Sequence, residues 1–522
     1  MEMARQGNRR AWLLGVLLLA IGGLAVSRLW PTPEPPHATT ATHEADYRTP
    51  AVDAFMAQVM VASKIADPLE RCLRMPDPPG SHWHAAAVDA YCHHRTATLL
   101  DATRFRALIA EGKGGEVDRL FEGYLQTQMH DRALAGFFDQ AMFRAGFHDA
   151  NEKTRKAIDD WKHQRPDSVF AVAASGMQYQ AAAFAARGAD SASKTSEAQW
   201  QGAQDQAALA RRDLDRAATM EPAVPIIYAT MLSNGVLTSD HPYVMSAIQR
   251  GLALQPNNLT LRLSQAAMTG EKWGGSTEWV ARQASDAEVA AADTPLLWVA
   301  VGRARIEAAT EGGMRPPKDG RFLALADEVA TGADFGKLAN EASRAHHYDQ
   351  AYILAVEALR FDNDQGEALY VIGSAASHDA YRAWGKAELI RAAQEHPESV
   401  EVAANAGVWL RYLGEPALAG PLMAYAADRG HETWVLSALG DYYAHEGKDY
   451  AKASAIAEEL IQRDPDDADG YVIRSCVQMN TGHPDRYRTL NAFLDRFGND
   501  PEQQRPAGQI RAWLKAHPQA TS

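Results

Sequence analysis

Two cysteines and four histidines between residues 72 and 94 form the densest group of potential metal ligands and nucleophiles in the chain. Nitrogen and sulfur donors of this kind suit zinc or copper. On a helix, however, His82 and His84 would point to different sides. We therefore expect no metal site and no cofactor. The group consists of Cys72, His82, His84, Cys92, His93 and His94.

The two cysteines of this group are better placed to form a disulfide. Cys72 and Cys92 lie on two expected helices, residues 51–73 and 82–100, which a Pro-Asp-Pro-Pro-Gly segment separates. In an exported protein a disulfide would pin this helical hairpin, and closing a loop of this size contributes about 3 kcal/mol in the loop-entropy model. The alternative is a pair of reduced, buried cysteines. Cys476 is expected to be a small buried apolar residue.

No motif in the chain predicts a catalytic residue. Ser191-x-x-Lys194 matches the start of the serine acyl-enzyme motif, but it lies in a polar stretch and no Lys-Thr-Gly accompanies it. Trp273-Gly-Gly-Ser is expected to be a tight turn with an aromatic anchor. The sequence therefore favours a protein that is not an enzyme. The alternative is an enzyme or small-ligand receptor whose site lies in residues 51–165, or around Trp273 and an insertion described below.

The N-terminal residues predict a membrane anchor. Residues 1–10 contain three arginines, and Ala11 to Ser27 is an uncharged run of 17 residues, the lower edge of what spans a bilayer. With residues 1–10 as a cytoplasmic tail and residues 11–30 as a transmembrane helix, we expect a single-pass inner-membrane protein with its body in the periplasm. The alternative is a cleaved signal peptide and a secreted or periplasmic protein. Residues 31–50, rich in Pro and Thr, would form a linker.

The rest of the chain has the apolar spacing of helices, and no alternating run predicts a strand. The formal net charge is −14, and no basic cluster follows the N-terminus. Nucleic acid is therefore excluded as a partner.

A repeat with a constant period organises these helices. Pro222 and Pro256 lie 34 residues apart. The same interval recurs in the C-terminal half, at Asn363, Pro397, His431 and Pro465. A fixed period in this range predicts stacked helical units whose stability comes from their neighbours. We expect an N-terminal helical region at 51–165, a repeat-like domain at 166–330 with an insertion at about 181–205, repeats at 331–501, and a capping helix and tail at 502–522.

The residues at these positions resemble the tetratricopeptide repeat, a pair of helices with the same period. One unit carries Leu369, Ile372, Gly373, Ala376, Gly385, Leu389, Ala392 and Pro397 at the positions of that pattern. The segment from about 161 to 285 also resembles an uncharacterised bacterial family, domain of unknown function 4034. The matching positions are Ala186 to Gly188, Thr195 to Trp200 and Trp273 to Ser276. The first resemblance implies an all-α solenoid.

The tetratricopeptide resemblance further implies a groove, lined by the first helix of each unit, that binds another protein or an extended peptide segment. The expected partner belongs to the cell envelope, so the chain would act there as an interaction scaffold. Carried over by position, the groove residues are Asn340, Arg344, Tyr370, Ser374, His378, Arg411 and Tyr412.

Overall fold

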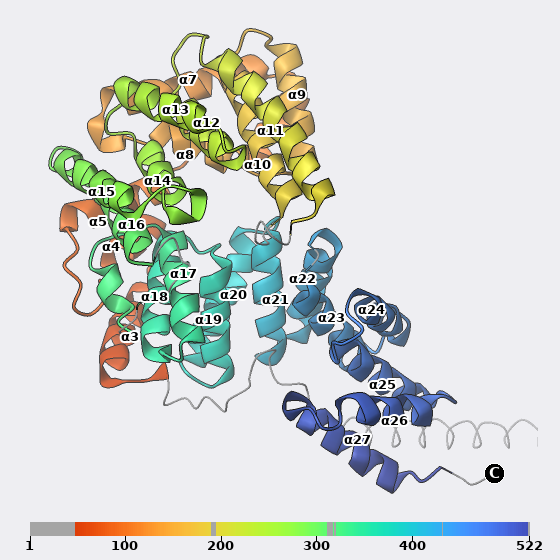
Figure 1. Cartoon of the computed structure of the whole chain (residues 1–522). Helices are drawn as coiled ribbons and strands as arrows, with labels where there is room; N and C mark the ends of the chain where they lie inside the picture. The colour runs from red at the N-terminus through yellow and green to blue at the C-terminus, as the bar shows by residue number, and fades with distance from the viewer. Residues whose placement is uncertain (1–46, 189–194, 311–316, 318–319, 431, 520–522) are drawn as a thin grey trace, which may run out of the picture. The chain divides into compact units, whose positions relative to one another are not determined.

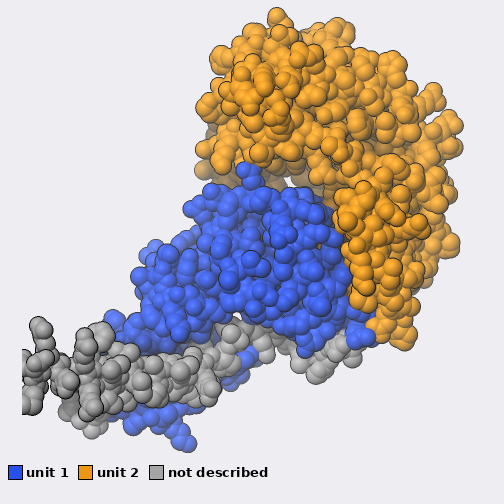
Figure 2. All heavy atoms as spheres, turned by 180° about the vertical axis from the view of Figure 1, so that it is seen from behind, with its two compact units in different colours: residues 1–49, 363–522 blue, residues 50–362 orange. Residues whose placement is uncertain are grey.

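The structure of the protein is a computed structural model, which describes the chain except for residues 1–46, 189–194, 311–316, 318–319, 431 and 520–522 (Figure 1). The described residues form helices joined by turns and contain no strand, which confirms the predicted all-α class. They group into two compact units (Figure 2). Unit 2 is residues 50–362, and the described part of unit 1 joins residues 47–49 with residues 363–522.

Unit 2 contains the helices from α3 to α18 and several short 3-10 helices. They are α3 (Pro50–Ala62), α4 (Pro68–Arg74), α5 (Ala85–Thr96), α6 (Ala102–Ala110), α7 (Gly114–His130), η1 (Arg132–Leu134), α8 (Phe137–Arg144), α9 (Glu152–Gln164), α10 (Val169–Arg187), α11 (Glu197–Ala217), α12 (Ile226–Leu237), α13 (His241–Leu254), α14 (Leu259–Met268), η2 (Glu271–Trp273), α15 (Thr277–Ala291), η3 (Pro295–Leu297), α16 (Trp298–Thr310), η4 (Leu323–Ala326), α17 (Gly332–Arg344) and α18 (Tyr348–Phe361).

Unit 1 contains the remaining helices. They are α19 (Gly366–Ser377), α20 (Arg382–Glu395), α21 (Val400–Tyr412), α22 (Pro416–Arg429), α23 (Thr433–His445), α24 (Tyr450–Arg463), α25 (Asp469–Thr481), α26 (Arg486–Phe497), η5 (Pro501–Gln503) and α27 (Gln504–Ala516).

Side-chain caps fix the starts of many of these helices. The side chains of Asn151, Asn258 and Ser276 accept hydrogen bonds from backbone amides in the first turns of α9, α14 and α15. Ser196 forms a capping box with Gln199 at the start of α11. These bonds satisfy amides that the helix itself leaves without a partner, so they mark where each helix begins.

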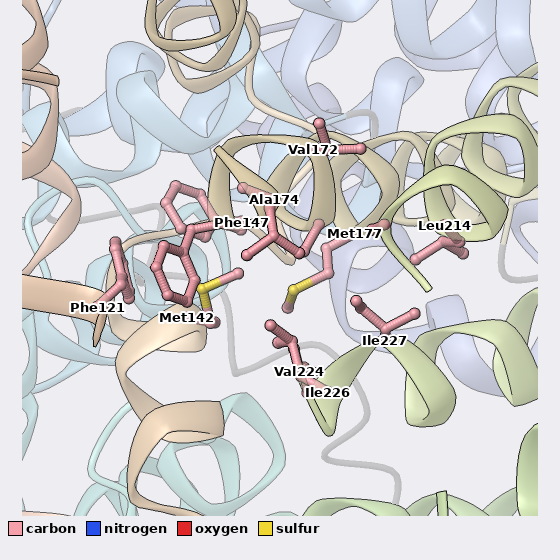
Figure 3. Packing of buried hydrophobic residues seen from close by; sticks show 14 of the residues in the cluster. Phe121, Met142, Phe147, Val172, Ala174, Met177, Leu214, Val224, Ile226 and Ile227 are labelled. Carbon is pink, nitrogen blue, oxygen red and sulfur yellow. The ribbon is translucent and has the colours of Figure 1, made fainter. Parts of the chain in front are cut away.

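The centre of unit 2 is a cluster of buried aromatic and aliphatic side chains from α6 to α14. The rings of Phe121, Phe147 and Trp161 are in mutual contact, with centroids 5.7 to 6.0 Å apart. Figure 3 shows Met142 and Met177 among the side chains of this cluster. Burying a side chain of this size contributes about 1.5–3 kcal/mol, so the cluster is a main source of the stability of unit 2.

The predicted insertion at about 181–205 covers the end of α10 and the start of α11. These helices contain 19 and 21 residues, whereas the helices of the first two pairs in unit 1 contain 12 to 14. They approach closely because α10 carries Gly176, where an added Cβ would lie 2.7 Å from the side chain of Leu214. The additional residues therefore lengthen a helix pair.

From α17 onward the period of the sequence corresponds to a succession of helix pairs. The first helices begin at Gly332, Gly366, Val400 and Thr433, and the last of these starts a single position ahead of the strict period. The second helices keep the period without deviation, beginning at Tyr348, Arg382, Pro416 and Tyr450. A helix–turn–helix unit of this length is the arrangement of a tetratricopeptide repeat.

Small residues in unit 1 allow these helices to approach one another. Gly373 of α19 lies against the indole of Trp409 in α21, and a Cβ added there would overlap the ring. Gly407 of α21 lies against α22, where an added Cβ would be 3.0 Å from the side chain of Met423. Any larger residue at these two positions would push the helices apart.

The predicted boundary at residues 330 and 331 falls inside unit 2. The reason is α18, which contacts the helical start of that unit. Arg360 donates from Nε to the carbonyl of Cys72 at 2.9 Å and from Nη1 to Asp77 Oδ1 at 2.9 Å. These contacts hold the α17–α18 pair in unit 2, which ends at Asp362.

The predicted tail and transmembrane anchor, residues 1–10 and 11–30, lie outside the described residues. Among the residues that the structure does describe, no helix is long and apolar enough to cross a membrane. The predicted single-pass inner-membrane location is therefore wrong by this finding.

Candidate partner-binding surface

Two of the predicted groove residues, Asn340 and Arg344, lie on α17 in unit 2. Arg344 is exposed, and its Nη1 lies 4.0 Å from Glu341 Oε1, one turn earlier on the same helix. An exposed pair of this kind contributes little to stability, about 0–1 kcal/mol. The guanidinium is therefore accessible on the surface of unit 2. The other five predicted groove residues belong to unit 1.

Tyr370, Ser374 and His378 follow one face of α19 because they are spaced one helical turn apart. The ring of Tyr370 meets the indole of Trp409 edge to face, with centroids 5.2 Å apart. His378 donates from Nδ1 to the backbone carbonyl of Ser374 at 2.9 Å, which orients the imidazole at the end of the helix. All three side chains are partly exposed, so this face of α19 is a candidate binding surface.

A segment from the other end of the sequence contacts this face of α19. A hydrogen bond of 3.0 Å joins the Tyr47 hydroxyl to Ser374 Oγ, and the Tyr47 ring stacks on His378 with centroids 6.1 Å apart. Tyr47 is 1% exposed, although it lies in the predicted linker. Two predicted groove residues therefore hold a side chain of this chain itself.

Arg411, also predicted to line the groove, is buried in an ion-pair network. Its Nη2 lies 2.6 Å from Asp441 Oδ2 and its Nε lies 3.1 Å from Glu446 Oε1, both on or next to α23. Burial by itself lowers the pKa of Arg411, but the charges of Asp441 and Glu446 outweigh it and raise that pKa above its usual value. Arg411 therefore joins α21 to α23. Its neighbour Tyr412 is half-buried against Trp409.

The polar network continues from α23 to α25. His445 Nδ1 lies 3.0 Å from Asp441 Oδ1, and His445 Nε2 lies 3.3 Å from Cys476 Sγ. The side-chain amide of Asn480 donates to the same sulfur at 3.3 Å. Burial by itself lowers the pKa of His445, but the hydrogen bonds to Asp441 and Cys476 outweigh it and raise that pKa to about 11. His445 is therefore a partly buried cation at neutral pH.

A cysteine, histidine and aspartate in this order are the residue types of a nucleophilic catalytic site. Reactive cysteines lie in partly exposed surroundings. Cys476 is only 1% exposed, so a substrate could not reach the sulfur. The arrangement holds three successive first helices together and gives no support for catalysis.

The sequence reasoning missed the residues that make up this network. Cys476 is buried as expected, but it is hydrogen-bonded to His445. No motif of the sequence singles out Asp441 or His445. A usable signal exists, because the Arg411–Asp441 pair and the His445–Cys476 pair each span nearly one repeat length. Complementary polar residues at this separation would lie on neighbouring first helices.

In unit 2, Cys72 and Cys92 form a disulfide with an S–S distance of 2.01 Å and a Cα–Cα distance of 5.8 Å. It joins α4 to α5. Arg360 contacts the carbonyl of Cys72, as described above, so the hairpin is fixed both covalently and by hydrogen bonding. The disulfide removes Cys92 from any set of metal ligands.

The histidines near this disulfide have separate partners. His82 pairs with Asp327 at 2.6 Å, the ring of His84 stacks on Trp298, and His93 contacts the carbonyl of Asp89. Burial, together with nearby arginines, lowers the pKa of His94 to about 3 and keeps it neutral. In the described part of the chain, no group of three or more His, Cys, Asp or Glu side chains could hold a metal ion.

The remaining sequence motif in unit 2 is a turn. Gly274 has a φ of +80°, and a Cβ added at Gly275 would overlap the backbone of Thr269. Ser276 then caps α15. This Trp-Gly-Gly-Ser segment therefore connects η2 to α15. The Ser-x-x-Lys motif at residues 191 and 194 lies outside the described residues.

The fold and the site together define an all-helical protein built of helix pairs, with one candidate surface on α19. Residues 101–251 match the family model of the domain of unknown function DUF4034. This match confirms the predicted resemblance to that family, and it covers less than half of the chain. Ala186 to Gly188 lie inside the matched segment, and Trp273 lies beyond it.

Comparison with solved structures finds helical-repeat proteins. Yeast Tom70 is 9% identical, with 80% of this chain and 94% of that chain covered and a TM-score of 0.29. The TPR domain of P58(IPK) is 11% identical, with 80% and 97% covered and a TM-score of 0.21. Scores this low add nothing to what the helix pairs themselves show. No curated protein matches the sequence.

Proposed function

We propose that this protein is a non-catalytic scaffold that binds a segment of another protein on the first helices of its repeats in unit 1. Arrays of helix pairs bury their apolar faces against their neighbours and leave a long row of first helices available for binding. The proposed surface is the face of α19 that carries Tyr370, Ser374 and His378. Arg411 is not part of it, because this residue is buried and its charge is already balanced by Asp441 and Glu446.

The observation that carries this proposal is the position of Tyr47. Ser374 and His378 hold a side chain that comes from a segment 327 residues away, by a hydrogen bond and by ring stacking. A surface that buries a tyrosine from a distant segment has the shape and polarity to bind a side chain from another protein. An aromatic anchor with a satisfied hydroxyl is typical of protein interfaces.

Site-specific photocrosslinking tests the proposal. A photoreactive phenylalanine analogue replaces Tyr370 in the full chain, in its native cells, and crosslinked proteins are identified by mass spectrometry. The matched control places the same analogue at Lys515, an exposed residue of α27. We expect a defined protein to be crosslinked at position 370 and not at 515. Equal patterns at both positions would contradict the proposal.

A further inference from the structure

The contact between Tyr47 and α19 has the features of side-chain recognition. The ring is buried at 1% exposure, its hydroxyl has a hydrogen bond to Ser374, and its face lies on the His378 imidazole. Phenylalanine would leave Ser374 without this bond, and an aliphatic residue would lose the stacking. The site on α19 therefore distinguishes tyrosine from phenylalanine and from aliphatic residues.

The next residue of the segment adds a charge to this contact. The guanidinium carbon of Arg48 lies 5.3 Å from the centroid of the Tyr381 ring, and Arg48 itself is exposed. A cation over an aromatic ring at this distance is attracted to the electron-rich face. Tyr381 ends the turn between α19 and α20. Two adjacent residues of the segment are thus bound by one helix and the turn that follows it.

This turn differs from the corresponding turns of the other repeats. In the α17–α18, α21–α22 and α23–α24 turns, one residue has a left-handed backbone, and these residues share one register of the repeat: His346, Gly414 and Lys448. In the α19–α20 turn, the same register would place the left-handed residue at Ala380. Instead Asp379 and Tyr381 are left-handed, with φ of 65° and 48°.

A left-handed tyrosine is unfavourable and persists only where surrounding contacts hold it. In this turn it positions the ring of Tyr381 beneath Arg48. The α19–α20 turn has therefore departed from the repeat at the point where the segment binds.

We propose that the face of α19 and the α19–α20 turn form a recognition site for a tyrosine followed by an arginine. Tyr47 and Arg48 occupy this site within the chain, and a partner protein binds by presenting its own Tyr-Arg pair in their place. This inference rests on the proposed function, because it names the class of segment that the same surface binds. Covalent connection gives Tyr47 a high local concentration, so the site is closed to weak competitors.

A peptide-binding experiment on the full chain tests the inference. The probe is a fluorescein-labelled peptide with the sequence of residues 45–52, and its binding is followed by anisotropy. The wild-type chain is compared with the double variant Tyr47→Ala/Arg48→Ala, in which the site is empty. The matched control is Arg486→Ala/Tyr487→Ala, which removes another Arg–Tyr contact of unit 1, with the guanidinium carbon 4.9 Å from the ring centroid.

We expect the emptied variant to bind the peptide at least about tenfold more tightly than the wild type. In the wild type only the fraction of molecules whose site is unoccupied can bind the peptide, so the apparent affinity is the intrinsic affinity multiplied by that fraction. The control variant should bind like the wild type. A peptide with alanine at both the tyrosine and the arginine should not bind. Adding His378→Ala to the emptied variant should abolish the gain.

Two outcomes overturn the inference: equal affinity of the wild type and the emptied variant, or equal binding of the alanine-substituted peptide. Loss of a buried ring could unfold unit 1, so Tyr47→Phe/Arg48→Ala provides a second test. It keeps the ring and removes the hydroxyl together with the Arg48 side chain beyond Cβ, and an intermediate gain in affinity is expected. If these tests fail while crosslinking at position 370 still captures a partner, the scaffold function stands and the Tyr-Arg specificity does not.

Discussion

Replacing Arg411 by methionine is expected to destabilise unit 1 by about 3 kcal/mol. Methionine retains much of the volume of the side chain but removes the charge that balances Asp441 and Glu446. Removing one partner of a buried ion pair costs about 3–5 kcal/mol, because the remaining charge has no compensation. Here the lower end applies. Glu446 is 23% exposed and can turn towards water, and His445 still lies 3.0 Å from Asp441.

The double variant Arg411→Met/Asp441→Asn should lose less stability than the sum of the two single variants. It leaves no uncompensated carboxylate at Asp441, so the two changes are coupled. The matched control is Arg488→Met, whose ion pair with Asp485 spans 3.0 Å, with side chains 79% and 46% exposed. This exposed pair should contribute less than about 1 kcal/mol.

Guanidinium-induced unfolding of the full chain, read by hydrogen exchange in α21 and α23, measures these differences. Exchange in individual helices is needed because the two units need not unfold in one transition. Additive effects of Arg411→Met and Asp441→Asn would refute the coupling. An equal cost for Arg488→Met and Arg411→Met would show that burial is not the cause.

Three further outcomes are expected. Gly373→Ala should cost about 1–3 kcal/mol, because the added methyl group overlaps the indole of Trp409. Gly508→Ala in α27 has open space around it and should stabilise by up to about 1 kcal/mol. Thermal melting compares the two variants. Reducing the Cys72–Cys92 disulfide should remove about 3 kcal/mol, and identical melting with and without reductant would contradict this. The folded-state pKa of His445, about 11, exceeds its unfolded value of about 6.5. The stabilisation that the charged His445 provides is therefore complete below pH about 6.5 and is lost as pH rises towards 11. His445→Gln should therefore flatten the decline, between pH 7 and 10, of the free energy of unfolding measured in urea.

The sequence alone was sufficient to predict the repeat, because the pattern that indicates it is local and recurs along the chain. Ala351, Gly385 and Ala419 share one register, and all three are buried on second helices. Each of these repeats places a small residue at the same close approach, so the pattern occurs several times within one chain. The pairing of helices follows directly from that spacing.

The chemistry of the candidate surface could not be predicted in the same way. A charged residue on a first helix, such as Arg411, normally indicates an exposed face. Its burial depends on Asp441, which belongs to the next repeat and satisfies the charge. Likewise, Tyr47 lies in a Pro/Thr-rich stretch with no local reason to fold. Its burial depends on residues that are remote from it in the sequence, among them Ser374 and His378.

The contact between Tyr47 and Ser374 also sets an order of events during synthesis. A ribosome that adds about 5–20 residues per second makes Ser374 roughly 16–65 s after Tyr47. During that interval residues 50–362 emerge, so unit 2 can fold while the surface that buries Tyr47 does not yet exist. Every newly made molecule therefore passes through a stage in which Tyr47 is uncovered. The packing of Tyr47 on α19 is a late step in maturation.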